Sequence, residues 1–80
     1  LGLFHPHESS EAHSELIQAS ECVRLAAYAL YNYTLQDNPE QQLILYRQSR
    51  DQIAQKNVYL RRFWNAIEIL QSNSQQQTEQ

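Results

Sequence analysis

Apolar residues recur along both halves of the chain at intervals that alternate between three and four residues. Such spacing places all the residues of a row on one side of an α-helix. The second row also contains a strict seven-residue repeat. The pattern predicts two amphipathic helices, over residues 9–36 and 39–71. The first row consists of Ala12, Leu16, Ala19, Val23, Ala26, Leu30 and Tyr33, and the second of Leu43, Tyr46, Ile53, Leu60, Trp64 and Ile67.

A signal that ends one helix and starts the next separates the two rows. Asn38 is a favoured N-cap residue, Pro39 fits the first helical position, and Gln41 can complete a capping box. Proline also disfavours helical geometry at the residue before it. Because so short a connection makes consecutive helices antiparallel neighbours, the predicted fold class is an all-α, antiparallel two-helix hairpin.

Folding the chain back at this turn brings small residues of the first helix opposite larger residues of the second. Ala26 comes opposite Arg50, and Ala19 comes opposite Asn57. Alternating sizes let side chains interdigitate. Asn57 is then either a buried polar residue that fixes the register of the helices or a residue at a partly wetted edge. The predicted hairpin core consists of Leu16, Ala19, Val23, Ala26, Leu30, Tyr46, Ile53, Leu60, Trp64 and Ile67.

The second helix carries more apolar residues than one neighbouring helix can cover. Between Val58 and Leu70 they occupy most of its circumference. Uncovered apolar and aromatic surface is typical of interaction sites. We therefore expect two hairpins to associate into a four-helix bundle, or the hairpin to dock onto another helical protein. The predicted partner-binding residues are Leu45, Tyr59, Phe63, Ala66, Leu70, Ile17, Tyr28 and Tyr31.

The length of the chain and the composition of its two ends indicate the domain organisation. Residues 1–8 contain the only glycine and one of two prolines, which predicts an irregular lead-in, with a helix start at Pro6 as the alternative. Residues 9–71 form the hairpin domain, and the polar residues 72–80 are expected to be disordered. A chain of 80 residues is small for a self-sufficient core. Because it contains no methionine, we expect a module of a larger protein.

Composition narrows the possible cellular locations and binding partners of the protein. The single cysteine, Cys22, excludes an intramolecular disulfide and argues against a disulfide-stapled secreted scaffold. The first residues lack the layout of a signal peptide, so an intracellular location is expected. A net charge of −3 opposes binding to nucleic acid. No apolar run approaches the roughly 20 residues that a membrane-spanning helix requires.

Candidate chemistry is sparse. The segment from His7 to His13 invites comparison with the zinc motif H-E-x-x-H, but Glu11 stands where the second histidine is required. His7 and Glu11 would supply two ligands on one face, whereas a site needs three or four. Cys22 lies in an alanine-rich stretch that favours a buried thiol over a nucleophile. We therefore expect no catalytic activity, metal or cofactor.

These observations predict a non-enzymatic module for protein–protein interaction or dimerisation. The partner is expected to be a second copy or a helical protein, with no membrane involved. The alternative function is a small regulator that binds nucleic acid through the second helix, where basic residues alternate with aromatic ones. The basic residues are Arg47, Arg50, Lys56, Arg61 and Arg62, and the aromatic ones are Tyr59, Phe63 and Trp64.

Overall fold

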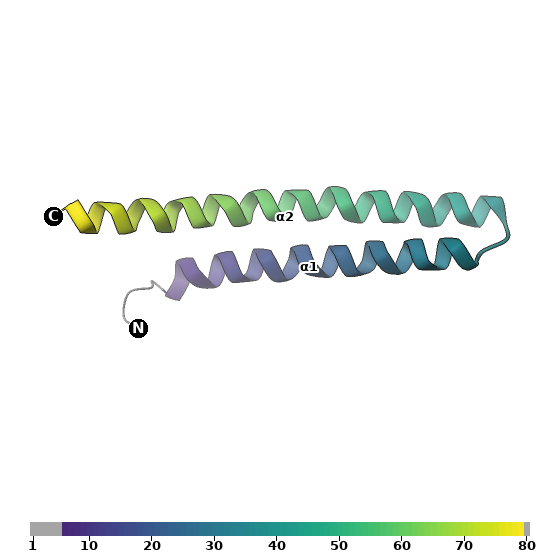
Figure 1. The fold of residues 1–80 in the computed structure, drawn as a ribbon, viewed down its shortest axis with the longest axis horizontal. Helices are drawn as coiled ribbons and strands as arrows, with labels where there is room; N and C mark the ends of the chain where they lie inside the picture. The colour runs from purple at the N-terminus through teal and green to yellow at the C-terminus, as the bar shows by residue number, and fades with distance from the viewer. Residues whose placement is uncertain (1–5, 80) are drawn as a thin grey trace.

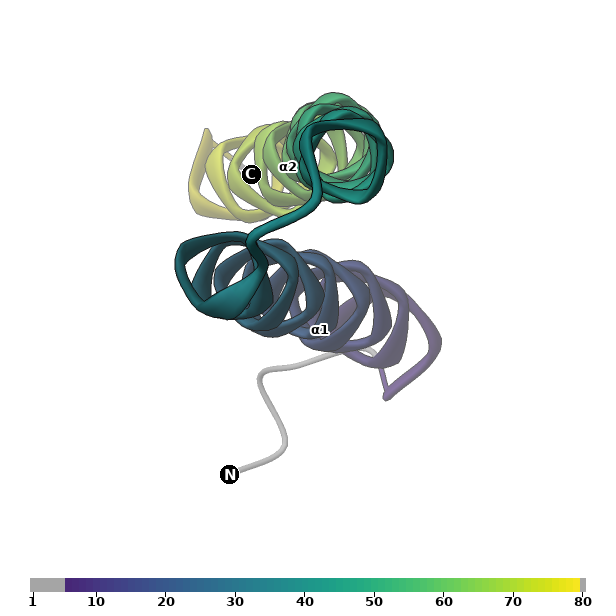
Figure 2. The ribbon, with the colours of Figure 1, turned by 90° about the vertical axis from the view of Figure 1, so that its right-hand side faces the viewer.

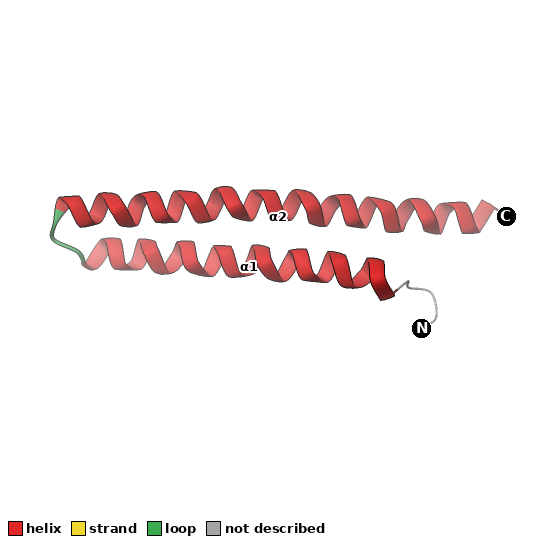
Figure 3. Cartoon of the chain, turned by 180° about the vertical axis from the view of Figure 1, so that it is seen from behind, coloured by secondary structure: helices red, strands yellow, loops and turns green. Residues whose placement is uncertain are grey.

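The computed structural model describes residues 6–79, with side chains over residues 10–74, as two α-helices and a turn. Helix α1 spans Pro6–Leu35, helix α2 spans Pro39–Glu79, and residues 36–38 connect them. The helices lie side by side and antiparallel in a rod with extents of 64 × 19 × 14 Å (Figure 1). The described part contains no strand, and its only loop is the turn (Figure 3). The predicted all-α class and the two-helix hairpin are confirmed.

Both helices extend beyond their predicted bounds at the open end of the hairpin. Helix α1 begins at Pro6, which was the alternative start, and α2 continues to Glu79 instead of ending at residue 71. No proline or glycine interrupts the chain after Pro39, and glutamine is a good helix former, so the backbone of the polar C-terminal part stays helical. Of the predicted lead-in, residues 1–5 lie outside the described residues.

The N-terminus of α2 is capped by Asn38. Its Oδ1 atom accepts hydrogen bonds from the backbone N–H groups of Glu40 at 2.8 Å and Gln41 at 3.3 Å. The predicted cap is therefore present. The reciprocal bond of the capping box differs from the expectation, because the Asn38 N–H donates to the Gln36 side-chain Oε1 at 3.4 Å. Gln36 thus has the role that the sequence suggested for Gln41.

The C-terminus of α1 is capped by a side chain of α2. The Gln42 Nε2 atom donates to the backbone oxygen of Gln36 at 2.8 Å and to that of Tyr33 at 3.4 Å. Terminal carbonyl groups of a helix have no partner within the helix. The Gln42 amide satisfies two such groups and connects the two helices across the turn.

Replacing Asn38 by alanine should destabilise the hairpin by about 1 kcal/mol, the usual cost of losing an N-cap side chain. The variant loses both hydrogen bonds to the first turn of α2. Urea unfolding followed by circular dichroism measures the change. Asn38→Asp keeps the accepting oxygen and should be close to wild type. Equal losses in the two variants would contradict this role for the cap.

A row of small residues on α1 makes the contact with α2. Over residues 10–35, every buried residue of α1 is an alanine or the cysteine, and over residues 39–74 α2 adds buried Ser49 and Ala66. Small side chains let the helices approach closely, and their axes are inclined to each other when viewed from the turn (Figure 2). We call this contact row the seam. It comprises Ala12, Glu15, Ala19, Cys22, Ala26 and Ala29 of α1, and Gln42, Leu45, Ser49, Gln52, Lys56, Tyr59, Phe63, Ala66, Leu70 and Asn73 of α2.

The seam differs from the predicted hairpin core. Ala19 and Ala26 are buried in it, and Leu60 and Ile67 are half-buried beside it. The other large residues of the predicted core are exposed. The cause is side-chain size, because a row of alanines permits a closer approach than the neighbouring row of leucine and valine. The exposed residues of the predicted core are Leu16, Val23, Leu30, Tyr46, Ile53 and Trp64.

Candidate interaction surface

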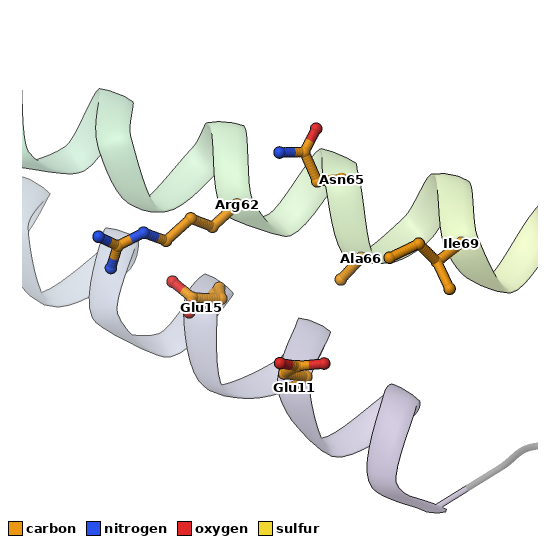
Figure 4. A pocket seen from close by; sticks show the side chains of 6 residues that line it. All are labelled: Glu11, Glu15, Arg62, Asn65, Ala66 and Ile69. Carbon is orange, nitrogen blue, oxygen red and sulfur yellow. The ribbon is translucent and has the colours of Figure 1, made fainter.

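Two grooves on the same side of the seam show which residues of α1 lie beside which residues of α2. In the half nearer the turn, Leu25 and Asn32 of α1 line a groove with Gln48 of α2. Towards the open end, Glu11 shares a groove with Arg62 and with Ile69 (Figure 4). This side is mostly polar, and we call it the polar edge. Its residues flanking the seam are Glu11, Gln18, Leu25, Asn32, Gln48, Gln55, Arg62 and Ile69.

The residues on the other side of the seam form a largely apolar surface across both helices. On α1 they recur every seventh residue and are 45% exposed at Leu16, 50% at Val23 and 42% at Leu30. On α2 the row includes Tyr46, which shares a groove at the turn with Tyr33 of α1. We call this surface the apolar face. It comprises Leu16, Val23 and Leu30 of α1, and Leu43, Tyr46, Ile53, Leu60, Trp64 and Ile67 of α2.

Aromatic contacts hold two of the large residues of the apolar face. Trp64 is 59% exposed, and its ring meets that of Phe63 edge to face, with centroids 5.4 Å apart and planes inclined by 67°. The Arg50 guanidinium lies 6.0 Å from the centre of the Tyr46 ring, a distance at which cation–π attraction operates. Arg50 and Asn57 are exposed on α2 at the border of this face. The exposed position of Asn57 agrees with the interpretation that this residue lies at a partly wetted edge.

The structure divides the predicted partner-binding residues between two places. Those of α2 line the seam, where α1 covers them. Those of α1 are exposed and lie away from the apolar face: Ile17 is 50% and Tyr31 is 61% exposed, and Tyr28, 64% exposed, lines the groove at the polar edge. The α2 residues in the seam are Leu45, Tyr59, Phe63, Ala66 and Leu70.

The outer surface of α1 also carries an ion pair one helical turn apart. The Arg24 Nε atom donates to Glu21 Oε2 at 3.0 Å, and a second bond joins the same two side chains. These hydrogen bonds lower the pKa of Glu21 and raise the pKa of Arg24. Because both side chains are exposed, the pair adds little to stability.

The basic residues of α2 do not gather on one surface. Lys56 lies in the seam, Arg62 lies at the polar edge, and Arg50 borders the apolar face. Arg47 and Arg50 line a groove together with the carboxylate residue Asp51. A nucleic-acid interface is typically a continuous basic patch. The arrangement gives the alternative function no particular support.

One acidic side chain at the open end of the hairpin is poorly satisfied. The Glu15 Oε2 atom is buried and has no hydrogen-bond partner among the described residues. Figure 4 shows Arg62 extending from α2 towards α1 beside Glu15. A buried oxygen without a partner weakens the contact around it.

The described helices were compared with the requirements of a metal site and of a membrane span. No group of three or more histidine, cysteine, aspartate or glutamate side chains described here could hold a metal ion. The side chain of His7, one half of the candidate ligand pair, lies outside the described residues. Over residues 6–79, neither helix has the length and apolar character needed to cross a membrane.

Comparison with known proteins does not place the chain in a family. No family, curated protein or solved structure matches it.

Proposed function

We propose that the hairpin is a homodimerisation module in which two copies bury their apolar faces against each other as a four-helix bundle. The observation that carries this proposal is the continuity of the exposed apolar face across both helices. Isolated apolar residues are common on protein surfaces, but a long contiguous row is typical of an interface. The polar edge on the opposite side of the seam has no comparable row.

The size of the apolar face fits a stable dimer. The apolar face runs along α2 from Leu43 to Ile67, a length of roughly 36 Å at 1.5 Å per residue. Across the 19 Å width of the hairpin, this length gives roughly 700 Å² per copy, not far below the approximately 800 Å² that each partner buries in a standard interface. A second hairpin has the same length and width, so it can cover the whole face.

The small amount of apolar side chain that the seam buries is a second argument for association. Among the described residues, no large side chain is fully buried in the single hairpin, and the buried residues are alanines, Cys22 and Ser49. Each large aliphatic side chain contributes about 1.5–3 kcal/mol when it becomes fully buried. Small chains often obtain this missing burial by oligomerising. The exposed Leu16, Val23, Leu30 and Ile53 are the residues that dimerisation would bury.

The first test is the mass of the protein in solution. Size exclusion coupled to light scattering should give twice the chain mass of 9.4 kDa at tens of micromolar, falling towards the monomer on dilution. A folded, strictly monomeric sample at that concentration would overturn the proposal. A mass of three or more chains would show that a face other than the single apolar face also associates.

A further inference from the structure

We infer that the two hairpins pair with their turns at the same end, so that α1 of one copy lies on α2 of the other. This inference rests on the proposed dimer and specifies its geometry.

Two symmetric arrangements bring the apolar faces together. With the turns at the same end, each α1 stacks on the partner's α2; with the turns at opposite ends, α1 stacks on α1 and α2 on α2. Every stacked pair is antiparallel in both arrangements.

The register of the hairpin identifies the residues that would meet. One groove brings residues 25–32 of α1 against residues 45–52 of α2. Ala27 therefore lies level with Arg50. Because the helices are antiparallel, every step forward on α1 corresponds to a step backward on α2. Ser20 is then level with Asn57, and Thr34 with Leu43.

Side-chain volume along the outer border of the apolar face favours turns at the same end. At each level of this border the α2 residue is larger than the α1 residue. Turns at the same end place the smaller residue of each level on the larger residue of the partner, as close packing requires. With the turns at opposite ends, the larger residues of the two α2 helices meet on one side of the bundle. On the other side, the smaller residues of the two α1 helices leave a gap. The border residues are His13, Ser20, Ala27 and Thr34 on α1, and Trp64, Asn57, Arg50 and Leu43 on α2.

Distance measurements between spin labels test the orientation. In a Cys22→Ser background, a nitroxide is attached at Asp37→Cys in the exposed turn. With turns at the same end, the labelled backbones lie about 10 Å apart, and the label-to-label distance should stay below roughly 30 Å. With turns at opposite ends, the length of α1 separates them by roughly 45 Å or more. The long distance would overturn the inference.

A second label separates failure of the orientation from failure of the dimer. Ala54 is exposed on α2, near the middle of the hairpin, so a nitroxide at Ala54→Cys should give a short distance in either arrangement. Dipolar coupling at Ala54→Cys together with a long distance at Asp37→Cys would refute the orientation and leave the dimer standing. Absence of coupling at both positions would refute the dimer and the orientation together.

Discussion

Replacing Ile53 by glutamate should convert the dimer into a monomer. Ile53 lies near the middle of the apolar face and is 42% exposed in the single hairpin. In the proposed dimer the introduced carboxylate would be buried without a partner, which is strongly unfavourable. Symmetry places the change on both sides of the interface. We expect association to weaken at least about 100-fold, about 2.7 kcal/mol, as measured by sedimentation equilibrium.

The matched control places the same charge on another exposed part of the hairpin. Tyr28 is 64% exposed and lies at the polar edge, on the opposite side of the seam from the apolar face, so Tyr28→Glu should remain dimeric. Circular dichroism should show both variants to be helical. If Tyr28→Glu dissociates and Ile53→Glu does not, the partner binds at the polar edge, and the apolar face is not the interface.

Replacing Ala26 by leucine should destabilise the hairpin by about 1–3 kcal/mol, the usual cost of overpacking a close contact. Ala26 is 4% exposed in the seam, and a larger side chain would push the two helices apart. Urea unfolding at a fixed protein concentration measures the change, since the apparent stability of the proposed dimer would depend on concentration.

Ala54→Leu is the control for this substitution. Ala54 is exposed on α2, where the same added volume should change stability by no more than about 0.5 kcal/mol. The comparison also removes the effect of helix propensity, which is nearly equal for alanine and leucine. If the two variants unfold at the same urea concentration, the alanines of α1 do not set the distance between the helices.

The turn and the two helices could be predicted from the sequence because their signals are local. Asn38 and Pro39 are adjacent and have strong, specific preferences at a helix start. The role of Gln42 was not predictable in this way. Its side chain bonds to backbone oxygens of α1, and glutamine has no comparable preference that marks such a contact.

The sequence did not indicate correctly which row of each helix faces the other helix. On α2 the seam row and the apolar face both repeat with a seven-residue period, and they lie next to each other on the helix surface. Periodicity cannot distinguish two such rows, and hydrophobicity favours the wrong one, because Ile53 is more apolar than Ser49. The deciding property is the size of the α1 side chains, with Ala19 and Ala26 in the seam and Val23 beside it.

The same reasoning explains why the predicted partner-binding residues of α2 lie in the seam while part of the predicted core of α2 is exposed. Tyr59 and Phe63 were expected to bind a partner, but they lie in the seam. Ile53 was expected in the core, but it is exposed. Each row contains enough apolar residues to serve as either surface. Only the packing of α1 against α2 distinguishes them.

The alanine seam also constrains how this sequence can change over evolution. Positions 12, 19 and 26 are buried in the seam, so we expect them to tolerate only small side chains. Positions 16, 23 and 30 can exchange one large aliphatic residue for another. Divergent descendants should therefore share little identity and still keep two interleaved seven-residue patterns on their first helix, one restricted by size and the other by hydrophobicity.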